Sequence, residues 1–558
     1  MGHSRWNLLP PVPPGLATGS ALPPLILDIL YHRGVVTLSQ IEAFLAADAR
    51  LSVDPFLLPD MHQAVGRLYQ ALLSGERVTV YGDYDVDGVS GTALLVQGLS
   101  LLGAEASPYI PHRMTEGYGL KTSALEQIRG KGTSLVVTVD CGITGAAEVQ
   151  KAKRLGLDII ITDHHTPLSE IPPAVAVVDP KLVSTPFPEF TGAGMAFKLL
   201  QALLRSLNRE DRLEELVDLA ALGTVADMAP LLGENRYLVK RGLQKMNTAP
   251  RLGIREIVTQ AALQGSLDSE AISWVVAPRL NTAGRLAHAL TSYQLLTTDS
   301  PQEARELAVW LEGKNAERQE LTTQAVARAR EQVLSRGIFP LLLVGDGECP
   351  PGVMGLVASR LADEFYRPAV MVRRGERTSS GSCRSIPEFN MVLALSQCGH
   401  LLTQFGGHSQ AAGFVLPTSN LPRLEEELLR IAAGALEGLD LRPQIDIDAE
   451  VALGELGGKT YQLLQKLAPF GQGNPNPVFL SRGVEVVDCR TMGNNGGHLR
   501  LKLRQCGVVW EAVAFGWGSC QGEISSPLDM VYSLELDRWC GEERLRLNVL
   551  DFASSRTK

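Results

Sequence analysis

The sequence predicts an α/β protein of several domains: a parallel-sheet domain, then a smaller α/β domain, then a small β-barrel or sandwich. The chain has 558 residues, which is too long for one hydrophobic core. In its first third, short apolar runs alternate with helical stretches, and this alternation is typical of a parallel sheet. From about Leu441 onward, short strands are separated by Gly and Asn turns, which is typical of an all-β unit.

The composition is that of a soluble globular protein with enough apolar surface for several cores. Hydrophobic residues make up 45% and charged residues 20% of the chain, and the mean hydropathy is +0.04. The net charge of -9 argues mildly against a protein that coats nucleic acid through bulk electrostatics. It does not exclude a nuclease, because a carboxylate-rich metal site is acidic until its cations bind.

The same sequence predicts a cytoplasmic protein without membrane association. Six prolines interrupt the first thirty residues, which therefore lack the apolar core of a signal peptide. No stretch is long and apolar enough to cross a bilayer. The eight cysteines form no CxxC pair, which argues against a zinc ribbon or a disulfide framework and favours a reducing compartment.

The order of the predicted elements defines the parallel-sheet domain. The strand 77–81 (RVTVY) is followed by the acidic loop GDYDVDG and by an apolar helix, GTALLVQGLSLLG. Further strands follow in the runs LVVTVDCG, DIIITDHH and AVAVVDP, and helices precede the first two of these. The pattern is then largely helical from about Thr191 to Thr297 and ends in an expected loop, APRLNTAGRL.

A long polar helix with spaced apolar residues is predicted from about Pro301 to Ser335, and we interpret it as a connector. The second α/β domain begins at PLLLVGDGE, continues through VMGLVASRLADEF and AVMVRR, and contains the Gly-rich segment FGGHSQAAG. The expected divisions are an N-terminal segment 1–65, the parallel-sheet domain 66–300, the connecting helix 301–336, the second α/β domain 337–436 and the β unit 437–558.

Acidic residues follow three of the predicted strands. They are Asp83, Asp85 and Asp87 after the first strand, Asp140 after the second and Asp163 after the third. Because the carboxyl ends of parallel strands border the ligand crevice of an open sheet, we expect these carboxylates to meet there. Carboxylates so close together repel one another, and bound cations relieve that repulsion.

Helix capping is the alternative role for each of these aspartates taken singly. The coincidence at three strand ends favours a metal site, and so do His164 and His165, because imidazole beside carboxylates suits Mn²⁺ as well as Mg²⁺. Two hard cations bridged by aspartate are used for phosphate-ester hydrolysis. An EF-hand calcium loop is excluded, because its twelfth position would be Leu94 instead of Glu and a strand precedes it.

Four motifs together resemble those of the DHH phosphoesterase family. They are GDYDVDG (82–88), TVDCG (138–142), TDHH (162–165) and ALGTVADMAPL (221–231), in the family's order. Five later segments resemble the RecJ branch of that family: PRLNTAGRL (278–286), GVMGLVASR (352–360), SCRS (382–385), FGGHSQAAG (405–413) and APFGQGNPNPVF (468–479). The resemblance implies a DHH domain joined by a long helix to a smaller α/β DHH-associated domain, followed by a C-terminal β-barrel of the OB-fold type.

The resemblance also implies a single-stranded-DNA-specific 5′ to 3′ exonuclease of DNA repair and recombination, with two divalent ions, Mn²⁺ or Mg²⁺. The implied metal ligands are Asp85, Asp87, Asp140, His164 and Asp227, with Asp140 as the bridge. The implied catalytic group is His165, Asp163 and Asp83. In this group His165 contacts the scissile phosphate, and Asp163 can equally orient a neighbouring imidazole. Val86 and Cys141 stand where the family often has Ala and Asn, between the motif carboxylates.

Substrate contacts are expected in both α/β domains. Arg279, Asn281 and Arg285 are candidates for gripping backbone phosphates through the bidentate guanidinium fork, with surface salt bridges as the alternative. The resemblance implies further contacts at Arg384, Ser385, Gly406, Gly407 and His408, across an interdomain groove from the metal site. A groove that admits one strand excludes a duplex.

In the C-terminal unit, Phe515, Trp517, Tyr532 and Trp539 can stack on bases, although most aromatics in a small barrel belong to its core. The expected partners are single-stranded DNA and, as candidates, a single-strand-binding protein and a helicase. Two alternatives stay open. A DHH-family oligonucleotidase or small-phosphate hydrolase generally lacks the PRLNTAGRL segment and the C-terminal unit, and a non-catalytic replication scaffold would not need every metal ligand.

Overall fold

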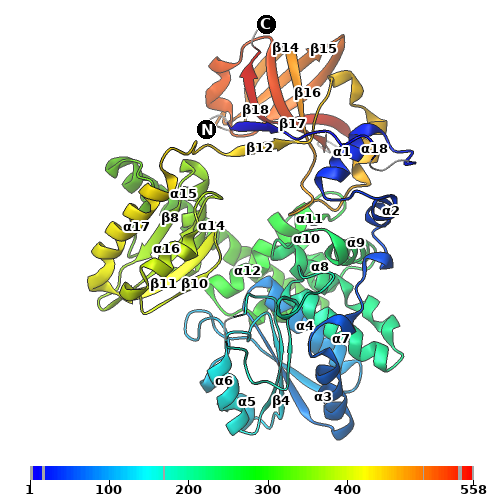
Figure 1. Cartoon of the computed structure of the whole chain (residues 1–558), viewed down its shortest axis with the longest axis vertical. Coiled ribbons are helices and arrows are strands. Elements are labelled where there is room, and N and C mark those ends of the chain that lie inside the picture. The colour runs from blue at the N-terminus through cyan, green and yellow to red at the C-terminus, as the bar shows by residue number, and fades with distance from the viewer. Residues whose placement is uncertain (1–3, 16–18, 168–169, 494, 538–542, 556–558) are drawn as a thin grey trace.

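The computed structural model describes residues 4–15, 19–167, 170–493, 495–537 and 543–555, and its architecture confirms the predicted fold class. Figure 1 shows three lobes, with the parallel-sheet domain at the bottom, the smaller α/β domain at the left and the barrel at the top. Among the described helices, none has the length and apolar character needed to span a membrane.

Five parallel strands form the sheet of the first domain. They are β2 (Arg77–Gly82), β3 (Glu105–Tyr109), β4 (Leu135–Val139), β5 (Asp158–Thr162) and β6 (Ala176–Val178), in the order β3-β2-β4-β5-β6. Every residue of the central strand β4 is buried, as expected for a parallel strand covered on both faces. The connections are α4 (Val86–Ser100), α5 (Thr122–Gly130) and α6 (Ala146–Arg154).

The strand order reverses between β2 and β4. The chain passes from β2 to β3 on one side and then returns to β4 on the other side of β2. In open α/β sheets, ligands bind outside the carboxyl ends of the strands at such a reversal. The sheet topology therefore marks the ends of β2 and β4 as the place to look for a functional site.

A group of helices shares one hydrophobic core with this sheet. They are α3 (Met61–Ser74), α7 (Gly192–Ser206), α8 (Val217–Ala226), α9 (Gly233–Thr248), α10 (Leu252–Gln260) and α13 (Leu290–Thr297). α7 and α8 both pack on α4, and most of their residues are buried. This packing brings the first turn of α7 and the end of α8 to the carboxyl ends of the strands.

The expected loop at APRLNTAGRL is wrong, because this segment is a helix, α12 (Ala277–Leu286). It continues a helical run that starts with α11 (Ser269–Ala271) and passes through a π-helical turn, Ile272–Val276. Pro278 lies in the first turn of α12, where its missing N–H and fixed φ are tolerated. Pro and Gly are strong loop indicators in a sequence, and here the helical surroundings override them.

The predicted connecting helix is α14 (Pro301–Arg336), which begins at the N-cap Ser300. Its first half buries Ala304, Ala308 and Leu311 in the core of the first domain. Its second half buries Ala325, Ala329 and Val333 in a core of the second domain. One continuous helix therefore belongs to both domains and fixes their spacing.

The second α/β domain has a mixed sheet in the order β10-β11-β9-β8-β7. Its strands are β7 (Leu342–Gly345), β8 (Ala369–Arg373), β9 (Thr378–Arg384), β10 (Gln404–Gly407) and β11 (Ala411–Pro417). Only the β7–β8 pair is parallel among the described pairings of this sheet. The helices are α15 (Pro351–Phe365), α16 (Met391–Gln397) and α17 (Leu421–Leu436).

The C-terminal strands close into a barrel. They are β13 (Ala449–Glu450), β14 (Val478–Met492), β15 (His498–Gln505), β16 (Val508–Ala514), β17 (Leu528–Asp537) and β18 (Arg544–Ser554). The sheet order is β13-β14-β15-β16-β18-β17, and β14 also pairs with β17, which closes the barrel. This closure is the OB-fold arrangement. The helix α18 (Gly458–Gln465) precedes β14.

The N-terminal segment is attached to the barrel. Strand β1 (Arg5–Leu8) pairs with β12 (Gln444–Ile447), and α1 (Pro24–His32) places Ile26, Ile29 and Leu30 in the barrel core. α2 (Leu38–Ala46) contributes Ile41 and Phe44 to the same core. The expected division at residue 66 falls inside α3, whose buried residues belong to the core of the parallel-sheet domain.

Candidate metal centre

Three carboxylates converge where the strand order reverses. Asp83 and Asp85 follow β2, and Asp140 follows β4. One oxygen from each lies within 4.8 Å of the others. Asp85 is also the N-cap of α4, because its Oδ1 accepts a hydrogen bond from Gly88 N at 3.0 Å. Asp85 therefore caps α4 and also belongs to the carboxylate cluster.

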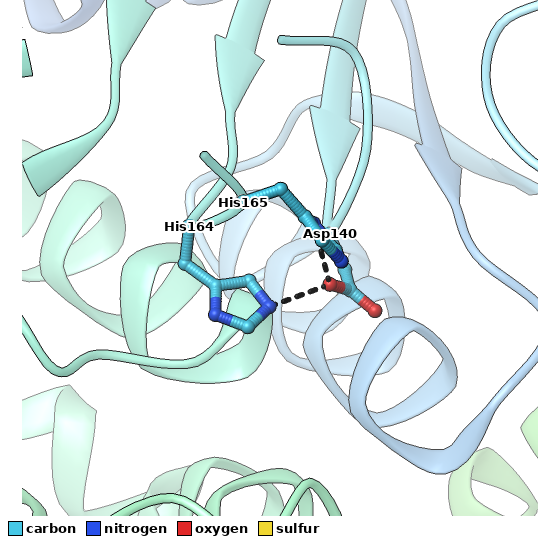
Figure 2. A group of neighbouring side chains, drawn as sticks. All are labelled: Asp140, His164 and His165. Atoms are coloured by element: carbon cyan, nitrogen blue, oxygen red, sulfur yellow. Dashed lines mark hydrogen bonds and ion pairs between the residues drawn. The ribbon is translucent and has the colours of Figure 1, made fainter. Parts of the chain in front are cut away.

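A second group adjoins the first. Ligand atoms of Asp87, His164 and Asp227 lie within 4.8 Å of one another. His164 Nε2 lies 3.9 Å from an oxygen of Asp87 and from one of Asp227, and 3.0 Å from Asp140 Oδ1. In Figure 2 the His164 ring points toward the Asp140 carboxylate, and dashed lines join that carboxylate to both His164 and His165. Asp140 thus lies between the two groups.

Two glycines allow the helices to approach the cluster closely. A Cβ atom at Gly192 would lie 2.3 Å from Asp140 Cβ, and one at Gly223 would lie 2.5 Å from Asp87 Oδ1. Gly192 N and Ala193 N, in the first turn of α7, donate hydrogen bonds to the two oxygens of Asp87, at 2.6 and 2.9 Å. The first turn of α7 therefore fixes the Asp87 carboxylate.

Burial and mutual repulsion raise the pKa values of these carboxyl groups. Burial, with added repulsion from Asp85, raises the pKa of Asp87 to about 7. Burial and then the charge of Asp87 raise the pKa of Asp227 to about 8. The same two causes raise the pKa of Asp83 and Asp140 well above the usual range. A cation bound beside these groups would therefore favour their ionised form and lower their pKa values.

The residues fit two hard divalent cations. Carboxylate oxygens with one imidazole nitrogen form a donor set that suits Mn²⁺ and Mg²⁺. Asp83 Oδ1 is buried and has no hydrogen-bond partner among the described residues, and a cation would satisfy it. Burial, and then the charge of His165, lowers the pKa of His164 to about 3, so this imidazole is neutral, which is the form that binds metals. Asp83, expected as a catalytic residue, thus lies where a ligand would be.

Asp163 orients the second imidazole. Its Oδ1 lies 2.8 Å from His165 Nδ1, and its oxygens also accept hydrogen bonds from Ile143 N and His164 N. Burial raises the pKa of Asp163, but the contacts with His165, the hydrogen bond from Ile143 N and the charge of His164 together lower it more, and the net result is below the usual value. Burial lowers the pKa of His165, but Asp163 and the charges of Asp227 and Asp83 together raise it more, and the net result is above the usual value. Asp163 therefore acts on the site through His165.

The second α/β domain meets the metal centre through the end of β10. The ring of His408 stacks on that of His165, with centroids 6.0 Å apart and an angle of 16°. Gly406 and Gly407 are exposed just before it. Gly407 has φ +136°, and a Cβ there would lie 2.3 Å from Ala411 O, so only glycine fits. His408, one of the predicted substrate residues, thus lies beside the metal centre, and Gly406 and Gly407 directly precede it in the chain.

Two predicted arginines also lie at the domain interface. Arg285 Nη1 donates to Gly352 O at 3.1 Å, and Arg384 Nη1 donates to Cys383 O at 2.8 Å. Burial, followed by the charges of nearby arginines, lowers the pKa of Arg285 to about 10, and burial also lowers the pKa of Arg384. Within the described part of the chain, no carboxylate forms an ion pair with either. Partly buried cations of this kind suit a phosphate group.

The remaining predicted residues have other partners. Arg279 forms an ion pair with Glu312 of α14 at 2.5 Å, so the salt-bridge alternative describes it here. Asn281 Oδ1 accepts a hydrogen bond from Val86 N at 3.2 Å, which supports the first acidic loop. The Ser385 hydroxyl donates to a backbone carbonyl four residues further along. Phosphate contact by these three residues stays a prediction.

Sequence reasoning missed two residues that follow β3. The Tyr118 hydroxyl donates to Asp140 O at 3.1 Å and lies 3.2 Å from His165 Nδ1. The Arg113 guanidinium lies 4.9 Å from the centre of the Tyr84 ring, and its charge helps to lower the pKa of Arg285. The strand-end argument, extended from the acidic strands to β3, points to both residues.

The expected stacking aromatics of the barrel are only partly available. Trp517 is 5% exposed and Tyr532 is fully buried, so both belong to the barrel core, which is one of the two alternatives that the sequence left open. Phe515 is 45% exposed, so stacking of its ring on a base stays a prediction. Trp539 lies outside the described residues.

Comparisons with known proteins cover the three lobes. The model of the DHH family, N-terminal domain, matches residues 77–224, that of the DHHA1 domain matches residues 337–434, and that of the RecJ OB domain matches residues 447–551. The single-stranded-DNA-specific exonuclease RecJ of Bacillus subtilis is 36% identical over 540 residues, which span 95% of this chain and 68% of that protein. The protein of the same name from Escherichia coli is 31% identical over 95% of each chain.

Solved structures agree with this result. RecJ from Thermus thermophilus in complex with Mn²⁺ matches with a TM-score of 0.85 and 32% identity, over 99% of this chain and 80% of that chain. The same protein in complex with Mg²⁺ matches with a TM-score of 0.79 and 31% identity, over 99% of this chain and 79% of that chain. The chain therefore belongs to the RecJ family of the DHH phosphoesterases.

Proposed function

We propose that this chain is a Mn²⁺- or Mg²⁺-dependent exonuclease that removes nucleotides from the 5′ end of single-stranded DNA. The observation that carries this proposal is the pair of ligand groups around Asp140, with His408 of the second domain stacked on the adjacent His165. The names of the RecJ relatives, and the Mn²⁺ and Mg²⁺ bound to one of them, support the same activity.

The two groups hold the two cations in this proposal. Asp83, Asp85 and Asp140 would hold one, Asp87, His164 and Asp227 would hold the other, and Asp140 is near enough to both groups to bridge them. When bound, such cations lower the pKa of water and stabilise negative charge on phosphate oxygens. The backbone N–H groups of α7 hold Asp87 in place, so this ligand needs little rearrangement when a cation binds.

His165 is the proposed catalytic imidazole. Its Nδ1 contacts Asp163, which leaves Nε2 as the atom that can donate to a phosphate oxygen. The raised pKa favours the protonated ring, and Asp163 and Tyr118 restrict its orientation. His165 would therefore stabilise charge on the scissile phosphate or deliver a proton to the leaving oxygen.

The interface between the two α/β domains is the proposed path of the strand. Arg285, Arg384 and Arg113 would bind phosphates, because these cations are partly buried and their charges reinforce one another. Exposed Gly406 and Gly407 let the strand approach the β10 backbone closely. Phe515 of the barrel is a candidate to stack on a base further along the strand.

Three finer statements belong to the same proposal. The enzyme acts in the cytoplasm, it takes part in DNA repair and recombination, and a single-strand-binding protein and a helicase supply its substrate. Helicases produce single strands by unwinding duplexes, and single-strand-binding proteins cover the strands produced. The proposed substrate is therefore the reason for proposing both partner classes.

The test is an assay with end-labelled single strands, duplexes, dinucleotides and pyrophosphate in Mn²⁺ or Mg²⁺. We expect mononucleotides from the 5′ end of long single strands, no reaction after chelation, and loss of activity in Asp140→Ala with the fold retained. Equal or faster hydrolysis of dinucleotides or pyrophosphate would favour a small-phosphate hydrolase. A fully active Asp140→Ala variant would contradict the metal assignment, and an inactive wild type with bound DNA would favour a scaffold.

A further inference from the structure

A buried arginine joins three separate parts of the chain. Arg236 of α9 is fully buried, and its guanidinium donates to Phe44 O at 2.7 Å, Leu467 O at 2.7 Å and Ala468 O at 2.8 Å. Two further carbonyls of the stretch 466–469 lie at 3.4 and 3.5 Å. The guanidinium carbon also lies 3.8 Å from the centre of the Phe44 ring.

Among the described residues, the charge of Arg236 is met by carbonyl groups and by the face of the Phe44 ring. Burial lowers its pKa to about 9, and no carboxylate pairs with it in the described part of the chain. A buried cation is costly unless all its hydrogen bonds are made with good geometry. The positions of the surrounding carbonyls are therefore tightly determined.

We call residues 466–474 the clasp. Asn474, the last residue of the clasp, is buried and ties this end to the beginning of the segment. Its Nδ2 donates to Leu467 O at 2.9 Å and to Pro469 O at 2.8 Å. Gly471 and Asn474 also exchange backbone hydrogen bonds of 2.9 and 3.1 Å. Arg236 and Asn474 share Leu467 O as an acceptor, so they hold the same turn of chain from two sides.

The clasp touches the loop that follows Asp227. Leu231 N donates to Gln472 O at 2.7 Å, and Leu231 is 2% exposed. A Cβ atom at Gly471 would lie 2.8 Å from Leu231 Cδ1, and Gly473 has φ +72°. The contact is thus made by backbone and by glycines, and it leaves little room for either segment to shift.

That loop contains a strained residue beside the metal centre. Asp227 ends α8, and Met228 has φ +57°, in the left-handed region that non-glycine residues seldom occupy. Such a conformation persists only where the surroundings determine it. Asn235 Nδ2 holds Pro230 O at 3.1 Å from one side, and the clasp holds Leu231 from the other.

We propose that the clasp, held by Arg236, positions Asp227 and so sets the affinity of the metal centre. This proposal rests on the proposed role of Asp227 as a ligand. It gives a role to the APFGQGNPNPVF segment, which supplies no residue to the two ligand groups. Because β14 begins at Val478, only a few residues beyond the clasp, the attachment of the barrel and the geometry of the metal centre depend on one element.

Arg236→Lys and Gly471→Ala test the proposal in the full-length protein. Lysine keeps the charge but loses the planar fork that reaches several carbonyls at once, and the alanine methyl pushes on Leu231. Arg33→Lys is the matched control. Arg33 also ties the N-terminal segment to the barrel region, through Asp448 at 2.8 Å and Pro475 O at 3.1 Å, without a hydrogen bond to the loop after Asp227.

The readout is Mn²⁺ binding, measured from the electron paramagnetic resonance of free Mn²⁺, together with the Mn²⁺ concentration for half-maximal exonuclease rate. We expect both test variants to bind Mn²⁺ about 10-fold more weakly, as is typical when a group that orients a ligand is altered. The KM for DNA at saturating Mn²⁺ should change less, and Arg33→Lys should bind Mn²⁺ as the wild type does.

Three outcomes separate the possibilities. Weaker Mn²⁺ binding in every test variant that folds, with Arg33→Lys unchanged, supports the clasp as a positioning element. Wild-type Mn²⁺ binding in a folded test variant overturns it, and Gly471→Ala decides the matter if Arg236→Lys does not fold. A wild-type protein that neither binds Mn²⁺ nor degrades DNA overturns the proposed function itself.

Discussion

Binding of Mn²⁺ to the cation-free protein should release protons in an amount that depends on pH. Carboxyl groups must lose their protons before they can serve as ligands. The pKa values of Asp87 and Asp227, about 7 and about 8, lie in the range where this release can be measured. Adding Mn²⁺ to chelator-treated protein is therefore a direct perturbation of the site.

The size of the release follows from these two pKa values. At pH 6, Asp87 is about nine-tenths protonated and Asp227 almost fully, so together they release about 2 protons per chain on binding. At pH 8, Asp87 is almost fully ionised and Asp227 is half protonated, so the release falls to about 0.6. Burial also raises the pKa values of Asp83 and Asp140, so these two groups add to the release.

Calorimetric titration with Mn²⁺ in two buffers of different ionisation enthalpy measures the protons released. The release should fall by about 1.3 protons between pH 6 and pH 8. In Asp227→Asn it should be smaller by about 0.9 protons at pH 7, where that group is mostly protonated in the wild type. A release close to zero, or one that does not change between pH 6 and pH 8, would refute the electrostatic account of the site.

Three further predictions concern packing, pH and substrate. Gly192→Ala places a Cβ 2.3 Å from Asp140 Cβ, so urea unfolding should show a loss of about 1–3 kcal/mol, whereas Gly313→Ala, exposed in α14 with open space around it, should gain about 0.8–1 kcal/mol. The folded pKa of Asp87 lies above its unfolded value, so this carboxyl stabilises the cation-free fold at low pH and the contribution is lost as pH rises toward 7. The free energy of unfolding of the chelated wild type should thus fall more between pH 5 and pH 8 than that of Asp87→Asn. An equal fall in both proteins would count against the raised pKa of Asp87. Arg384→Met should raise the KM for single-stranded DNA about 10-fold and lessen its salt dependence by roughly one phosphate contact, whereas an unchanged salt slope would remove Arg384 from the strand path.

The strand ends could be predicted because parallel topology dictates where they meet. The apolar runs before Asp83, Asp140 and Asp163 are unambiguous, and their carboxyl ends must lie on one rim of the sheet. Asp227 is different, since it ends a helix and reaches the rim through tertiary packing of α8 on α4. Only the family resemblance identified it from the sequence.

Other features depend on tertiary contacts that local patterns do not encode. Burial assigned Trp517 to the barrel core, although the sequence left its role open. Arg236 was not singled out, because nothing local indicates that a charged residue of an ordinary helix will be buried among carbonyls from distant segments. The position of Arg279 against Glu312 likewise depends on the crossing of α12 and α14.

Crystals of the wild-type protein grown with Mn²⁺, measured at the manganese absorption edge, test the central claim most directly. We predict two anomalous peaks, one bounded by Asp83, Asp85 and Asp140 and the other by Asp87, His164 and Asp227. Manganese bound elsewhere, with these side chains turned away from one another in an active enzyme, would contradict the account.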